Sequence, residues 1–234
     1  GWPNDWAEST ISHLPAGVGF MSVSEWDLPI VRGGVASTVG EYSISAVGPG
    51  PRATRHWSLA REHGLRTFAK IQAGATWEMS AVPYIPALRL LAEHARNLRE
   101  AGIDGVMLGW TLGGYPSPNL EVVRDVLNGA PVQQAMLSAA ETRYGTQIAP
   151  DVVEAWNKAS DAFLEFPYHV SVVYNAPHHV APANRLWTSP TGYRATMVGI
   201  PYDDLDGWRG IYPADVFIRQ MRRTSGGFEE AAAR

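Results

Sequence analysis

The sequence predicts an α/β fold, namely half of a TIM-type (β/α) barrel with parallel strands, followed by a helical, loop-rich extension. Between residues 17 and 128, short apolar runs alternate with longer helical patterns, as they do in consecutive β/α units. This alternation stops near residue 130, so we expect a barrel-like part over 1–130 and an extension over 131–234. A closed barrel needs eight strands and about 250 residues. Only four β/α units are visible here; a small doubly wound sheet is the competing architecture.

The four strands are predicted where apolar runs end at Gly, Pro or polar turn residues. They are expected over residues 17–24, 42–47, 66–72 and 104–110. Clear helical patterns follow three of the four runs. This arrangement indicates parallel strands joined by right-handed crossovers.

The connecting helices are expected over residues 52–63, 83–101 and 120–127. Pro51 suits the first position of a helix, and Gly64 and Gly102 suit the residue just beyond a helix end. In the second helix, apolar residues recur at spacings of three and four, which places them on one face. Asn119 can cap the third helix.

The extension is predicted to contain helices over 131–144, 151–166 and 213–223. Residues 168–174 form a short run that favours an extended conformation. Residues 175–215 are rich in Pro, Asn, Asp and aromatic side chains, so we expect long loops there.

Composition excludes several classes of protein. The formal net charge is −4 and no basic cluster occurs, so a nucleic acid is not an expected partner. No apolar run approaches the roughly 18 residues that cross a bilayer, so no membrane association is expected. The chain has no cysteine, which rules out disulfides, thiolate nucleophiles and cysteine-based metal sites.

Two glutamates are candidate catalytic residues because of where they stand. Glu25 follows the first predicted strand, and Glu78 lies in the loop after the third. In parallel α/β folds, ligands bind at the carboxyl ends of the strands. Two carboxyl groups at such an edge suit glycoside hydrolysis, in which one protonates the leaving oxygen while the other attacks carbon or activates water. Either glutamate can instead be a solvated loop acid.

Further polar and aromatic residues near the predicted strand ends would bind a sugar. Indole and phenol rings provide flat apolar surfaces for a sugar ring, and they desolvate a neighbouring carboxyl. Lys70 and Gln72 share one face of a strand, and either amide or ammonium can hydrogen-bond a hydroxyl. The predicted substrate-binding residues are Trp26, Asp27, Lys70, Gln72, Trp77, Trp110, Tyr115, Asn119, Tyr174, Asn175 and His178.

Other chemistries find little support in the sequence. His178 and His179 are adjacent, so on an extended segment their side chains point to opposite faces and make a poor metal site. The Gly-x-Ser-x-Gly motif of serine hydrolases and the glycine-rich loops that bind phosphate do not occur. We therefore predict no metal and no other cofactor.

Three segments resemble glycoside hydrolases of the (β/α)₈-barrel type, most closely bacterial carbohydrate-active proteins with a helical region after the barrel. These segments are residues 76–78, 104–119 and 174–184. The resemblance implies that Glu25 and Glu78 are the acid/base and the nucleophile, and that Trp110, Tyr115 and Asn119 line the cleft. The chain departs from the pattern at Ser24-Glu25, where such enzymes carry Asn-Glu, and in lacking the first half of the barrel.

The sequence thus predicts a glycoside hydrolase that cleaves an oligosaccharide or glycoconjugate. Two alternatives remain open at this point, namely a carbohydrate-binding protein without activity and a hydrolase of another class such as an esterase. A half-barrel also leaves two unpaired sheet edges, which proteins normally pair or cover. We therefore expect a homo-oligomer if this is the full chain.

Overall fold

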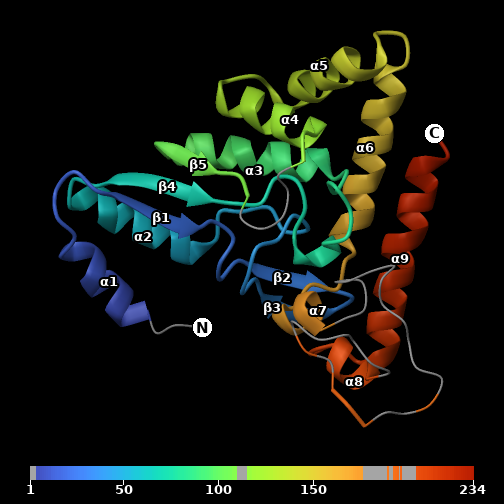
Figure 1. Ribbon diagram of the computed structural model, residues 1–234, viewed down its shortest axis with the longest axis horizontal. Helices are drawn as coiled ribbons and strands as arrows, with labels where there is room; N and C mark the ends of the chain where they lie inside the picture. The colour runs from blue at the N-terminus through green and yellow to red at the C-terminus, as the bar shows by residue number, and fades with distance from the viewer. Residues whose placement is uncertain (1–3, 110–114, 176–188, 190–191, 195, 197–203) are drawn as a thin grey trace.

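The fold is built around a small parallel sheet (Figure 1). The computed structural model describes residues 4–109, 115–175, 189, 192–194, 196 and 204–234. In these residues β1 (Gly19–Val23), β4 (Arg66–Lys70) and β5 (Gly105–Met107) form one sheet in the order β1-β4-β5, and both pairs are parallel. The α/β class with a parallel sheet is therefore confirmed.

Helices connect these strands as β/α units. Helix α2 (Pro51–Glu62) joins β1 to β4, α3 (Leu88–Glu100) joins β4 to β5, and α4 (Pro118–Leu127) follows β5. Pro51 occupies the first turn of α2, where its missing N–H has no intrahelical partner to lose. The three predicted connecting helices are thus confirmed, with starts and ends that differ by a few residues.

The predicted strand over 42–47 is wrong. The main-chain N–H groups of Ile44 and Ser45 donate to the carboxylate of Glu78 rather than to a neighbouring strand. The preceding stretch instead forms an antiparallel hairpin of β2 (Pro29–Arg32) and β3 (Val35–Thr38). Gly33 and Gly34 make its two-residue turn with φ of 57° and 87°, which glycine adopts without strain. A Gly-Gly pair between short apolar runs is the signal for this hairpin.

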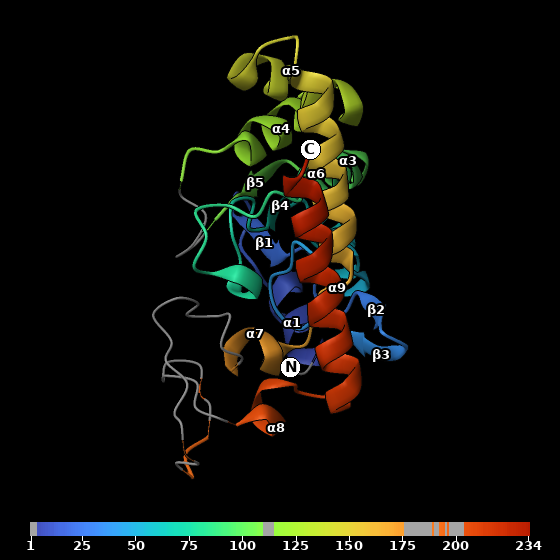
Figure 2. The same cartoon turned by 90° about the vertical axis from the view of Figure 1, so that its right-hand side faces the viewer.

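The extension packs as helices beside the sheet layer. It comprises α5 (Val132–Tyr144), α6 (Ala149–Leu164), α7 (Val170–Asn175), α8 (Leu205–Trp208) and α9 (Ala214–Ala232). Helices α6 and α9 lie side by side in both views (Figures 1 and 2). Helix α7 contradicts the predicted extended run over 168–174: its valines favour strands, but Val172 and Val173 are both buried in the core, and two adjacent residues cannot share one face of a strand.

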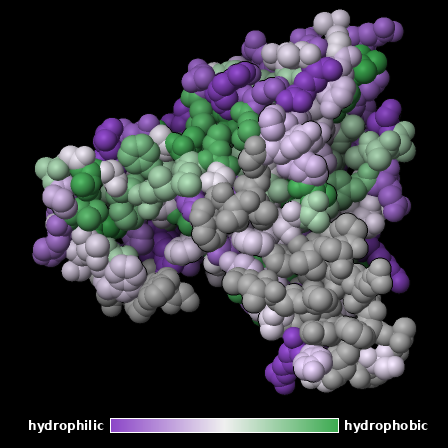
Figure 3. All heavy atoms as spheres, viewed as in Figure 1, coloured by the Kyte–Doolittle hydropathy of each residue, from purple (hydrophilic) through white to green (hydrophobic). Residues whose placement is uncertain are grey.

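The two faces of the sheet differ sharply. On one face, Ala69 and Ile71 pack against Trp57 of α2 and Leu98 of α3 in a buried cluster. The register places Met21, Phe68 and Gly105 together on the opposite face, with Val23, Lys70 and Met107 beside them. We call this second surface the bare face, because Met21 and Met107 remain 44% and 38% exposed. Figure 3 shows hydrophobic residues gathered over this region.

The largest core cluster combines residues from both predicted parts of the chain. It includes Ile30 and Leu91 from the first part and Phe163 and Tyr212 from the second. No helix among the described residues is long and apolar enough to cross a bilayer. Helix α1 (Asn4–Ser12), which precedes β1 in the chain, packs on α2.

Candidate functional site

The candidate site lies at the carboxyl ends of the parallel strands. Glu25 comes two residues after β1, Gln72 comes two residues after β4, and Asn119 is in the first turn of α4 beyond β5. Glu78 belongs to η1, a short 3₁₀ helix (Trp77–Met79) in the loop between β4 and α3. Each of these four side chains is at most 1% exposed. Buried polar groups normally have hydrogen-bond partners, and these four side chains differ in the partners that they have.

Glu78 is held by a dense set of hydrogen bonds. Its Oε1 accepts from the hydroxyls of Ser43 at 2.7 Å and Ser45 at 2.5 Å. Its Oε2 accepts from the N–H of Ile44 and the hydroxyl of Thr76, both at 2.7 Å. Burial raises the pKa of Glu78, and these hydrogen bonds oppose that rise because they stabilise the charged form. The carboxylate thereby fixes the 43–45 segment against the β4–α3 loop.

Glu25 has the opposite environment. Its Oε2 is buried without a hydrogen-bond partner. Burial raises the pKa of Glu25 well above its usual value, and the negative charge of Glu78 raises it further. In many enzymes two neighbouring carboxyl groups have different surroundings, so that one transfers a proton while the other stays ionised and stabilises positive charge. Glu25 is the member of this pair that keeps its proton to the higher pH.

The backbone around Glu25 is tightly fixed. Ser24 Oγ and His94 Nε2 share a buried hydrogen bond of 2.7 Å. Burial lowers the pKa of His94 to about 3, so its imidazole is neutral at pH 7. A Cβ at Gly48 would stand 2.5 Å from His94 Nε2, and one at Gly50 would stand 2.2 Å from the carbonyl oxygen of Trp26. Glycine is required at both positions because the segment that leads into α2 passes so close to the turn that carries Glu25.

Two amides at the same edge retain unused hydrogen-bonding atoms. Neither Oε1 nor Nε2 of Gln72 has a partner, although the side chain is 1% exposed. Asn119 Nδ2 donates to the carbonyls of Ala73 and Ile85 at 2.8 Å each, while its Oδ1 is unpartnered. Buried polar atoms without partners are uncommon in proteins, so they mark positions where a ligand can supply the missing bonds.

Aromatic side chains surround a third carboxyl group nearby. Tyr174 donates to Glu41 Oε2 at 2.5 Å, and its ring centroid lies 6.1 Å from that of Trp77. The ammonium of Lys70 lies 5.2 Å from the centroid of the Tyr42 ring. The structure therefore brings together Trp77 and Tyr174, two of the predicted substrate-binding residues, and places Glu41 and Tyr42 near them.

Other predicted site residues lie elsewhere. Asp27 pairs with Arg52 at 3.2 Å, and the Arg52 guanidinium lies 5.4 Å from the Trp26 ring centroid, which places this group beside α2. Tyr115 is 55% exposed, and Asn175 ends α7. Trp110 and His178 lie outside the described residues.

The residues that sequence reasoning missed are Ser43, Ile44, Ser45 and His94. The Ser-Ile-Ser segment has the pattern of a strand, and no spacing rule reveals that its donors converge on a carboxylate 33 to 35 residues away. His94 is a lone histidine on the apolar face of α3, where a core position is the ordinary expectation.

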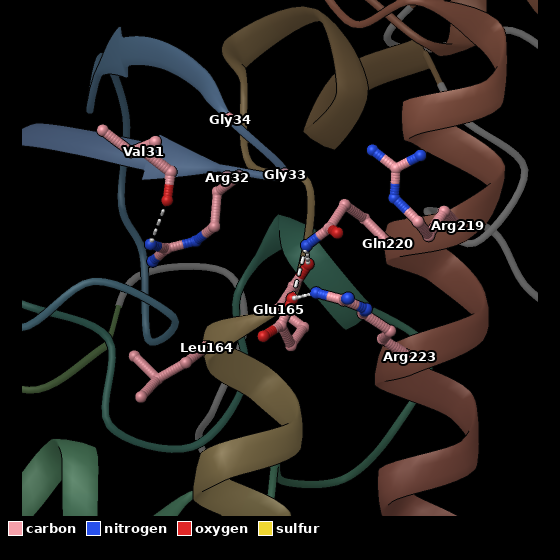
Figure 4. A pocket seen from close by; sticks show the side chains of 9 residues that line it. All are labelled: Val31, Arg32, Gly33, Gly34, Leu164, Glu165, Arg219, Gln220 and Arg223. Atoms are coloured by element: carbon pink, nitrogen blue, oxygen red, sulfur yellow. Dashed lines mark hydrogen bonds and ion pairs between the residues drawn. The ribbon is translucent and has the colours of Figure 1, made fainter.

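A separate cavity of about 350 Å³ lies between the β2–β3 turn, the end of α6 and α9 (Figure 4). Its basic residues are Arg32, Arg219 and Arg223. Glu165 accepts from Gln220 at 2.6 Å and pairs with Arg223 at 3.3 Å, so the cavity already contains a carboxylate of the chain itself. Arg32 donates to the carbonyl of Ser45 at 2.6 Å and thereby supports the segment that holds Glu78. We therefore assign this cavity a structural role.

No group of three or more His, Cys, Asp and Glu side chains suited to a metal ion occurs within the described part of the chain. Comparison of the chain with protein-family models, with curated proteins and with solved structures found no match.

Proposed function

We propose that the protein is a glycoside hydrolase acting on an oligosaccharide or glycoconjugate, built on part of a (β/α) barrel. The single observation that carries the proposal is Glu25, a buried carboxyl with a raised pKa and an unpartnered oxygen at the carboxyl end of a parallel strand. A general acid for glycosidic oxygen needs those properties, because it must hold a proton near neutral pH and present it to the substrate.

In this proposal the two glutamates act differently. Glu25 protonates the leaving oxygen as the glycosidic C–O bond breaks; a water molecule then forms the new bond to the anomeric carbon and returns a proton to Glu25. Glu78, already hydrogen-bonded at both oxygens, supplies negative charge that keeps Glu25 protonated and stabilises positive charge at the anomeric carbon. The unpartnered atoms of Gln72 and Asn119 would bind sugar hydroxyls, and Trp77 with Tyr174 would contact the ring face.

The first test is hydrolysis of a panel of aryl glycosides by the parent and by Glu25→Gln, with Glu121→Gln as a control. Glu121 forms a partly exposed ion pair with Arg143 of α5 and contacts none of the proposed site residues in the hydrogen bonds of the described chain, so its variant should match the parent. We expect Glu25→Gln to lose about 10²- to 10⁴-fold in kcat on substrates with poor leaving groups.

Leaving-group dependence separates an acid from a residue that only maintains structure. A dinitrophenyl glycoside needs no proton on its leaving oxygen, so Glu25→Gln should lose far less activity on it than on a methylphenyl glycoside. The alkaline limb of the parent pH profile should also disappear in the variant, because that limb reports ionisation of the acid. Equal losses on both substrates, or no turnover by the parent, would reject the proposal.

A second candidate is a carbohydrate-binding protein without activity. The observation that favours it is the saturation of Glu78, whose oxygens have no position left for a nucleophilic attack. Under this candidate Gln72→Ala weakens sugar binding, measured by calorimetry, while no member of the glycoside panel is turned over.

A further inference from the structure

The outer edge of β1 presents peptide groups that pair with no other strand among the described residues, although the carbonyl of Val23 accepts from the hydroxyl of its neighbour Ser22 at 3.3 Å. In the described sheet β1 pairs with β4 alone. Ser24 donates its N–H to the carbonyl of Lys70, so the even-numbered residues of this strand direct their peptide groups toward β4. Because successive residues of a parallel strand face opposite neighbours, the N–H and C=O groups of Gly19, Met21 and Val23 face away from the sheet.

A cavity of about 380 Å³ runs beside this edge, between β1 and α1. Its lining includes residues 20–23, four in succession along β1, together with Trp6 of α1 and His56 of α2. Side chains alternate between the two faces of a strand, so a cavity that contacts four consecutive residues follows the strand edge. The remaining lining residues are Ala7, Thr10, Ile11, Trp26 and Arg52. We call this space the β1 groove.

The β1 groove is uncharged overall and has two unused ring nitrogens. His56 is 5% exposed, and neither its Nε2 nor Trp26 Nε1 has a hydrogen-bond partner. Burial and then the charge of Arg52 lower the pKa of His56, which is therefore neutral at pH 7. The charge of Arg52 itself is balanced by Asp27 at 3.2 Å. Such a groove suits a neutral occupant that provides hydrogen-bond acceptors beside apolar groups.

We propose that the β1 groove receives an extended, uncharged polypeptide segment as a further strand, with one large apolar side chain in the aromatic part of the groove. Its main chain pairs with Gly19, Met21 and Val23, and its carbonyls accept from the Trp26 indole and, in its Nε2–H form, the His56 imidazole. In strand addition of this kind, the main-chain hydrogen bonds provide affinity and the side-chain contacts provide selectivity. The inference stands independently of the proposed activity.

Two features of the sheet favour a strand over a small molecule. Parallel sheets in proteins are normally covered on both faces, whereas within the described residues this one has a bare face and an open β1 edge. Residues 14–24 also contain none of the charged side chains that commonly protect edge strands. A small aromatic molecule would fill the space yet leave the row of peptide groups unpaired.

The test uses the blocked peptide TVTFTVT and the same peptide N-methylated at every residue, which keeps the side chains and removes all the main-chain donors. Binding is followed by amide chemical shifts and hydrogen exchange of the full chain. We expect exchange to slow at Met21 and Val23, and the N-methylated peptide to bind about tenfold more weakly, since it loses the main-chain bonds. Benzyl alcohol serves as the small-molecule comparison.

Two variants locate the site. Met21→Pro removes an outward N–H without removing a bond to β4, a substitution that edge strands tolerate, and should abolish peptide binding. Trp26→Phe combined with His56→Phe keeps both aromatic rings, removes the two nitrogens, and should weaken binding by about fivefold even if the proline variant fails to fold. Trp208→Phe removes another unpartnered indole N–H in α8 and should change nothing.

Three outcomes would overturn the proposal. The first is absence of peptide binding at millimolar concentration. The second is equal affinity for the methylated and unmethylated peptides. The third is that benzyl alcohol binds as tightly as the peptide and displaces it completely, which would make the groove a small-molecule site.

Discussion

His94 shows how one buried side chain can set both local geometry and pH dependence. Its Nε2 meets Ser24 Oγ at 2.7 Å, immediately before Glu25, and a Cβ at Gly48 would collide with its ring. The imidazole therefore fixes the turn that carries Glu25. Because burial lowers its pKa from 6.5 to about 3, it does so as a neutral group.

We predict that His94 makes the protein less stable in acid. In the unfolded chain His94 binds a proton below about pH 6.5, whereas the folded protein leaves it neutral until about pH 3. The free energy of unfolding should therefore fall, by up to about 1.4 kcal/mol per pH unit, as pH drops through this window. His94→Gln retains a hydrogen-bonding group and does not titrate, so urea unfolding from about pH 7 to about pH 5 should show a shallower slope. Parallel slopes for parent and variant would contradict this assignment.

At the scale of single residues, the sequence predicts where a side chain lies in the fold better than it predicts which groups that side chain contacts. Glu25 and Gln72 both lie at strand ends, as expected from the order of apolar runs and loops. The sequence does not indicate that Glu78 is saturated by donors from 43–45, because those contacts depend on how two loops fold against each other. The roles of Glu25 and Glu78 as a catalytic pair stay predictions.

Among the described elements, α6 and α9 form the most extensive helix–helix contact, and adjacent glycines in α9 have different surroundings. A Cβ at Gly227 would lie 2.5 Å from Ala162 Cβ and 3.1 Å from its Cα, so the helices cross there with no room for a side chain. A Cβ at Gly226 would meet nothing within 4 Å. The end of α9 was expected at 223, but the crossing at Gly227 stabilises the helix through to Ala232.

These glycines give a matched pair of substitutions. Gly226→Ala should stabilise the protein by up to about 1 kcal/mol, because alanine favours the helix and the site is open. Gly227→Ala gains the same propensity but must separate α6 from α9, so we expect a net loss of about 1–3 kcal/mol. Thermal and urea unfolding measure both changes. Stabilisation by both substitutions would show that the two helices separate at little cost.

Elements with a strong repeating pattern are predictable from the sequence, and elements defined by tertiary contacts are not. The amphipathic spacing of α3 and the apolar run of β4 identify both without further information. Segment 42–47 has strand-like alternation, but its N–H groups bind a carboxylate instead of a strand. Helix α7 similarly overrides the strand preference of its valines by burying two adjacent side chains.

The whole molecule presents a bare face that the chain itself does not cover in the described residues. Met21 and Met107 stand on it from the two outer strands, both more than a third exposed. Exposed apolar surface beside open sheet edges favours association between copies. This provides a structural basis for the homo-oligomer expected from the sequence, which stays a prediction.

We expect the parent to associate with rising concentration and the double variant Met21→Lys with Met107→Lys to remain monomeric, as measured by light scattering. Both positions tolerate lysine because they are exposed. Val31→Lys is the control, since Val31 is 61% exposed on the β2–β3 hairpin, away from the bare face. A monomeric parent, or a control that dissociates as readily, would exclude the bare face as the contact.

The barrel architecture remains a proposal at this scale. Three parallel strands with helices on one face match a segment of a (β/α) barrel, and one strand fewer is present in the described residues than the sequence predicted. Sequence patterns identify β/α units one at a time. They do not determine curvature or closure, which depend on strand tilt and on neighbours at both edges.

The ring of Phe68 lies between β1 and β5, and it restricts the substitutions that both neighbouring strands can accept. A Cβ at Gly19 of β1 would lie 2.4 Å from the ring, and one at Gly105 of β5 would lie 2.7 Å from its other side. A single aromatic residue therefore dictates glycine at two positions that are 86 residues apart in the chain. A side chain at either glycine is compatible with this sheet only when residue 68 becomes smaller or its ring moves.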